Sequence, residues 1–97
     1  MTNANYKRGY RAELQAKKIL EGYGYTVLRS AKSGGPFDIV GFKKEGIIAV
    51  QVKACPIGVV PSYPRVRKEI ENVPTPTNCK KELWIKESRK GWHYFPL

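Results

Sequence analysis

The chain has 97 residues, enough for one domain with a modest core and too few for two. Its hydrophobic content of 41% is that of a folded protein, and no apolar stretch reaches the ~20 residues that a membrane span needs. Eighteen Lys and Arg against eight Asp and Glu give a formal charge of +10, which favours nucleic-acid binding over a charge that serves only solubility.

A helix with one apolar and one basic face is predicted over residues 6–22. On a helical wheel at ~100° per residue, with Tyr6 as its zero, the apolar arc comprises Ala12, Ala16, Ile19, Leu20 and Tyr23. The opposite arc comprises Lys7, Arg8, Arg11, Gln15 and Lys18. Gly22 and Gly24 are expected to end the helix. Glu13 lies at the margin of the apolar arc, where its carboxylate either reaches the edge of a covered sheet or pairs with Lys17, four residues on.

The rest of the chain predicts strands and one short helix. Strands are expected at 25–30, 37–43, 47–54, 81–87 and 91–95, and a second helix at 65–72, between two proline-containing loops. The Ile, Val and Ala content of 47–54 is typical of a strand covered on both faces. This order predicts an α/β fold with a mixed central sheet flanked by helices, formed as one domain over residues 1–97.

Asp38, at the start of one of two adjacent strands, is predicted to share a sheet face with Gln51 and Lys53 on the next. Side chains alternate along a strand, so Gln51 and Lys53 lie on one face. A two-residue turn at Lys44-Glu45 places Asp38 opposite Gln51, and a turn one residue later places it opposite Lys53. Only a three-residue turn would put Asp38 on the other face.

These residue types predict a magnesium site. Mg²⁺ prefers oxygen ligands and is held by one or two carboxylates, here Asp38 and Glu13. The amide oxygen of Gln51 and the backbone carbonyl of Val52 complete the predicted protein ligands. Such a metal lowers the pKa of an attacking water and neutralises phosphate charge, while Lys53 positions the water or stabilises the pentavalent phosphate. Mn²⁺ is expected to substitute for Mg²⁺ at this site.

The order Glu, x-Pro-x-Asp, Gln-x-Lys resembles the PD-(D/E)xK nuclease superfamily, and more narrowly the archaeal-type Holliday junction resolvases. The resemblance covers most of residues 6–54 and the last strand, whereas 56–80 diverge. It implies a restriction-endonuclease-like fold and a homodimeric, metal-dependent DNA endonuclease that resolves four-way junctions by paired nicks. It also matches Ser33 to a serine of the family's mobile catalytic loop, and Glu13, Asp38 and Lys53 to its catalytic residues.

Gln51 departs from the resolvase pattern, which generally has Glu at this position, so metal affinity is expected to fall. Two alternatives therefore stand beside junction resolution: another PD-(D/E)xK nuclease of the DNA repair or restriction type, and a catalytically inactive DNA-binding homologue. The predicted DNA contacts are Lys7, Arg8, Arg11, Lys18, Arg29 and Lys32. Trp84, Trp92, Tyr94 and Phe95 are interpreted as core or dimer interface.

The N-terminus has no apolar signal-peptide core, so a cytoplasmic or nucleoid-associated protein is expected, without membrane contact. Cys55 and Cys79 are either two free thiols or one disulfide, and His93 has no standard zinc spacing to them.

Overall fold

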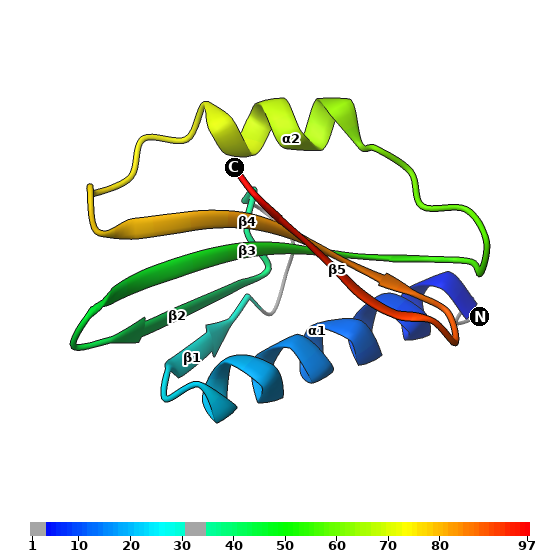
Figure 1. The fold of residues 1–97 in the computed structure, drawn as a ribbon, viewed down its shortest axis with the longest axis horizontal. Coiled ribbons are helices and arrows are strands. Elements are labelled where there is room, and N and C mark those ends of the chain that lie inside the picture. Colours follow the sequence, from blue (N-terminus) through cyan, green and yellow to red (C-terminus); the bar gives the residue numbers. More distant parts are fainter. Residues whose placement is uncertain (1–3, 31–34) are drawn as a thin grey trace.

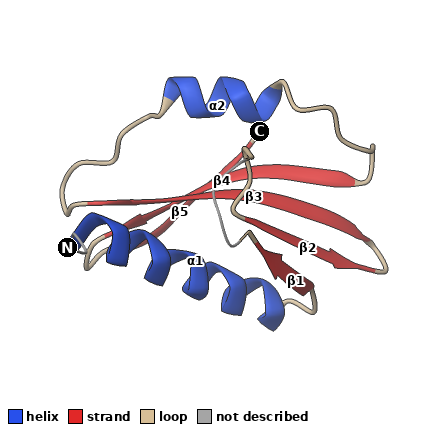
Figure 2. Cartoon of the chain, turned by 180° about the vertical axis from the view of Figure 1, so that it is seen from behind, coloured by secondary structure: helices blue, strands red, loops and turns tan. Residues whose placement is uncertain are grey.

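The computed structural model describes residues 4–30 and 35–97, and within these ranges two helices lie on opposite faces of a five-stranded sheet (Figures 1 and 2). The elements are α1 (Ala4–Gly22), β1 (Thr26–Arg29), β2 (Ile39–Lys43), β3 (Gly46–Cys55), α2 (Pro64–Glu71), β4 (Cys79–Glu87) and β5 (Gly91–Pro96). The strands lie in sequence order; β3 and β4 are parallel and the other neighbours antiparallel. The predicted α/β class with a mixed, flanked sheet is confirmed.

α1 packs on β1, β2 and β3 through a stripe of small and aliphatic side chains. Ala12, Ala16 and Leu20 are buried there, as the wheel predicted, against β-strand residues that include Val50. Tyr23 is the exception, because it is 70% exposed. The helix ends at residue 22, so the helical repeat no longer sets the direction of the next side chain. No helix in the described part of the chain is long and apolar enough to span a membrane.

The second layer of core lies under α2. It contains Cys55, Ile70, Leu83 and Ile85, all buried. The terminal carbonyls of α2 are capped by the Lys81 ammonium, which donates to the carbonyls of residues 71 and 73 at 2.9 and 3.0 Å. Side chains of β3 thus enter both layers alternately, which explains why the strand is almost uniformly apolar.

Of the predicted aromatic group, Trp84 is core. It is 4% exposed and belongs to the cluster beneath α1, with the Trp92 and Tyr94 rings at 5.9 and 4.8 Å in edge-on contact. Phe95 packs on the opposite layer, under α2. Tyr94 is 48% exposed, so β5 presents part of this aromatic group to solvent.

The turn between β2 and β3 has two residues, Lys44 and Glu45, since Lys43 pairs with Gly46. This is one of the two registers that place Asp38 on the face of Gln51 and Lys53. Gly46 has φ 154°, and a Cβ at this position would lie 2.7 Å from the Asn78 carbonyl oxygen. Glycine at this position therefore allows the start of β3 to pack closely against the residue that precedes β4.

Glu87 anchors the loop that leaves β3. This buried carboxylate accepts the Gly58 N–H at 2.8 Å and contacts His93 Nε2 at 2.8 Å. Both contacts lower the pKa of Glu87, the backbone hydrogen bond more than the histidine. The loop that leads from β3 to α2 is thus held against the β4–β5 hairpin.

Cys55 and Cys79 are free thiols. Cys79 pairs with Ile47 and Cys55 with Glu87, so the two lie at opposite ends of the β3–β4 ladder. Eight residues of strand, roughly 26 Å, separate them, which excludes a disulfide within the chain.

Candidate functional site

Asp38 lies immediately before β2, where the ladder between β2 and β3 ends. Its N–H donates to the Val50 carbonyl at 2.9 Å, and its carbonyl accepts the Ser30 N–H at 2.8 Å. The side-chain Oδ2 accepts the Val52 N–H at 2.8 Å. The N–H and C=O of one strand residue point to the same side, so the Val52 carbonyl oxygen also faces the β2 side of β3. A carboxylate and a backbone oxygen therefore converge at this edge.

Glu13 approaches from α1 and is paired with β1. Its Oε1 lies 3.3 Å from Arg29 Nε, and the two side chains are 22% and 24% exposed. The Arg29 nitrogen has no well-aligned hydrogen bond, so the contact is ionic, and the guanidinium also lies 4.7 Å from the Tyr10 ring centroid. The alternative partner for Glu13, Lys17, is wrong: Lys17 pairs with Glu21 at 3.9 Å.

The pKa of both carboxyls is raised. For Asp38, burial outweighs the Val52 N–H and the positive charges of Lys53 and Arg29, which lower the pKa. For Glu13, burial is the largest cause and repulsion by Asp38 the second, opposed by Arg29. The two carboxylates therefore lie within electrostatic reach of each other, and each is disfavoured in its charged form. A bound cation would relieve both costs.

Gln51 and Lys53 project from the face of β3 that is turned away from α1, because their neighbours Val50 and Val52 belong to the α1 layer. The β2–β3 pairing ends at Ile39 and Val50, and the Asp38 N–H still donates to the Val50 carbonyl. The ammonium of Lys53 lies 5.8 Å from the Tyr63 ring centroid, and its charge acts on the pKa of Asp38. The Asp38 carboxylate thus lies within electrostatic reach of the Lys53 ammonium, whereas a face shared by Asp38, Gln51 and Lys53 stays a prediction.

The donor atoms fit a hard divalent cation. No three His, Cys, Asp or Glu side chains cluster in the described residues, so the candidate site has two carboxylates. Mg²⁺ uses one or two carboxylates and completes its octahedron with neutral oxygens and water. Glu13 and Asp38 would hold it, with the Val52 carbonyl and the Gln51 amide oxygen as neutral donors.

The predicted DNA contacts are dispersed. Arg8, Arg11 and Lys18 are exposed on α1. Arg29 is engaged by Glu13, so its first role in this structure is to hold that carboxylate. The side chains of Lys7, Lys32 and Ser33 lie outside the described residues.

Two features of the site were missed by sequence reasoning. Tyr63, whose ring faces Lys53, has φ 49° at the start of α2, and nothing in the divergent segment marks it. The pairing of Arg29 with Glu13 joins two charges sixteen positions apart. The sequence does show an acid, Glu13, at the expected helix margin and a base, Arg29, at the expected strand end. Their contact, however, depends on the packing of α1 on β1.

Comparison with known proteins gives two findings. Residues 4–59 match the sequence model of a family described as archaeal Holliday junction resolvase (hjc). Among solved structures, the fold is similar to that of Hjc from Archaeoglobus fulgidus, a Holliday junction resolvase from an archaeal hyperthermophile. The TM-score is 0.70 at 22% identity, over 89% of this chain and 73% of that one. A search of curated protein sequences gives no match.

Proposed function

This chain belongs to the archaeal Holliday junction resolvase family, and we propose that it is a Mg²⁺-dependent endonuclease that resolves four-way DNA junctions by paired nicks. The observation that carries the catalytic assignment is the convergence of Asp38, Glu13 and Lys53, two acids with raised pKa beside one ammonium. The same residues support metal dependence, since the charged carboxylates need a cation. Paired nicks on opposed strands require two sites, so we assign the active form to a homodimer.

Each residue has a role that follows from its position. The Val52 N–H orients the Asp38 carboxylate, and Arg29 holds Glu13 from the side of β1. The Lys53 ammonium acts electrostatically on Asp38, and its role is to stabilise the negative charge that develops on the phosphate. When bound, Mg²⁺ supplies charge neutralisation and lowers the pKa of an attacking water.

The direct test is cleavage of a synthetic four-way junction. We expect nicks in Mg²⁺ and none in chelator, with the four separate linear arms cut far less than the junction. Products are separated on denaturing gels, and junction strands labelled one at a time show whether opposed strands are cut. Equal cutting of linear arms would favour a repair or restriction-type nuclease, and no cutting in Mg²⁺ or Mn²⁺ would contradict the proposal.

Gln51 favours one competing function, an inactive DNA-binding homologue, because an amide replaces a charge at a metal-ligand position. Gln51→Glu is expected to tighten Mg²⁺ binding about tenfold, in line with the ~10–100-fold effect of changing groups around a metal. The measurement is the Mg²⁺ concentration that gives half-maximal cleavage. Gln51→Ala is the matched control, which removes the oxygen without adding charge.

Two outcomes separate the functions. If Gln51→Glu lowers the half-maximal Mg²⁺ concentration of an already active wild type, the amide is a working ligand. If only Gln51→Glu cuts, the native chain binds DNA without catalysis.

A further inference from the structure

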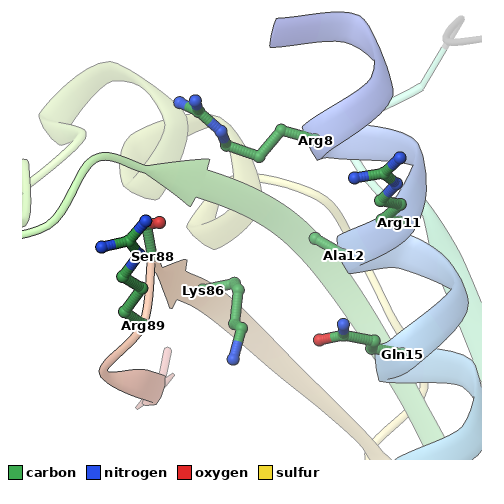
Figure 3. A pocket seen from close by; sticks show the side chains of 7 residues that line it. All are labelled: Arg8, Arg11, Ala12, Gln15, Lys86, Ser88 and Arg89. Atoms are coloured by element: carbon green, nitrogen blue, oxygen red, sulfur yellow. The ribbon is translucent and has the colours of Figure 1, made fainter. Parts of the chain in front are cut away.

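A cleft on the α1 side of the sheet lies between α1 and the β4–β5 hairpin and is separate from the carboxylate site (Figure 3). Its volume is about 340 Å³, and it is lined by Arg8, Arg11, Ala12, Gln15, Lys86, Ser88 and Arg89. Two arginines come from the helix, and a lysine and an arginine from the hairpin (Figure 3). The remaining polar groups, an amide and a hydroxyl, are neutral hydrogen-bond donors.

The four cations of the cleft are not neutralised. In the parts of the chain that the structure describes, none of them has a carboxylate within 4.0 Å, and the lining contains no Asp or Glu. Glu87, which follows Lys86 in β4, points to the opposite face of the strand and is already engaged by Gly58 and His93. Like charges that face each other across a gap repel, so an anion between them lowers the energy of all four.

The cleft is distinct from the catalytic site, because its lining includes neither Glu13, Asp38 nor Lys53. Glu13 faces Arg29 on β1, at one edge of the sheet, whereas the cleft is bounded by Lys86 on β4. β1 and β4 are three strand spacings apart, about 14 Å.

We infer that this cleft binds a backbone phosphate of the DNA substrate at a second point, away from the cut. The inference rests on the proposed function for the identity of the anion. Arg8 and Arg11 present guanidinium groups from one wall and Arg89 from the other, and guanidinium binds phosphate oxygens in a bidentate manner. The catalytic site and the cleft, on the two flanks of α1, each contact the DNA backbone. These two contacts fix the direction in which the DNA crosses the helix.

The test removes the hairpin wall. Lys86→Met keeps an unbranched aliphatic side chain but removes the ammonium, which lies 6.0 Å from the Trp92 ring centroid, and Arg89→Gly suits the left-handed backbone at φ 64°. The matched control, Lys44→Met with Lys90→Met, removes the same charge from two exposed lysines outside the cleft. Binding of a synthetic four-way junction, and of a linear duplex of one arm, is measured in chelator over a series of salt concentrations.

The double variant Lys86→Met/Arg89→Gly is expected to raise Kd at 0.1 M salt by roughly tenfold per lost contact and to reduce the salt slope by about 1 to 2. The control is expected to change both much less. Equal losses in the two variants, or no loss in the first, would overturn the inference. If the double variant binds both the duplex and the junction more weakly, the phosphate in the cleft belongs to the arm being cut. If it binds only the junction more weakly, the phosphate belongs to a neighbouring arm.

Binding in chelator does not depend on catalysis. A wild type that binds the junction but never cuts it therefore contradicts the proposed function and leaves the cleft open to the same measurement. Thermal unfolding of each variant, followed by circular dichroism, shows that a change in Kd is not a loss of fold.

Discussion

Asp38→Asn is expected to reduce junction cleavage by about 10³-fold or more while junction binding stays within a few-fold of wild type. Asparagine keeps an acceptor for the Val52 N–H, so the local backbone is preserved. It removes the charge that would hold the metal. The measurement is the single-turnover rate at saturating junction, with Kd determined in chelator.

The same substitution is expected to stabilise the fold by about 1 kcal/mol at neutral pH, as at other strained functional positions. Burial raises the pKa of Asp38 above its value in the unfolded chain, so the folded state binds this proton more tightly. Wild-type stability therefore improves as pH falls through the raised pKa, and Asp38→Asn already has that improvement at neutral pH.

Metal-dependent cleavage has the opposite dependence on pH and is expected to fall as the carboxyls become protonated. Unchanged cleavage by Asp38→Asn would remove Asp38 from the site.

Lys53→Met is expected to lower the cleavage rate by about 10²–10³-fold, the range found when one preorganised donor to a developing charge is removed. Methionine retains an unbranched aliphatic stem and removes the ammonium that faces the Tyr63 ring, so the loss reports the charge. Rates at saturating junction are compared with Lys53→Arg, which keeps the charge but changes its shape.

A second readout separates a direct role for Lys53 from a structural one. Lys53 lowers the pKa of Asp38, so its removal is expected to move the acid limb of the pH–rate profile to higher pH. Lys53→Arg is expected to leave that limb near its wild-type position. A variant Lys53→Met that cuts at the wild-type rate with an unmoved profile would contradict the assignment.

The two-residue turn between β2 and β3 was predictable because it depends on local sequence within one hairpin. It brings Asp38 within electrostatic reach of Lys53, whereas a face shared by Asp38, Gln51 and Lys53 stays a prediction. Glu13 was predictable as a helix-margin residue, but its partner Arg29 was not. The burial of Tyr23 was predicted wrongly, because a wheel continues a helix past the residue where hydrogen bonding ends it.

The cleft was not predictable for a different reason. Arg8 and Arg11 were expected to contact DNA, but Lys86 and Arg89 were not grouped with them. Their meeting depends on β4 being placed beside β3 and on the first turns of α1 lying over that end of the sheet. Those arrangements are set by packing between segments that are about 75 residues apart, and no local pattern encodes them.

The parallel pairing of β3 with β4 sets the order in which the nuclease site can form during folding. Asp38 is brought against Val50 and Val52 by a tight hairpin, and hairpins close in about 1–10 μs. β4 joins β3 only after the chain crosses over, since Ile47 pairs with Cys79. Contacts of such large sequence separation form slowly. The catalytic hairpin is therefore expected to form early, before β4 pairs with β3 and completes the hydrophobic core. That late pairing, rather than the alignment of the catalytic groups, limits how fast a new chain becomes active.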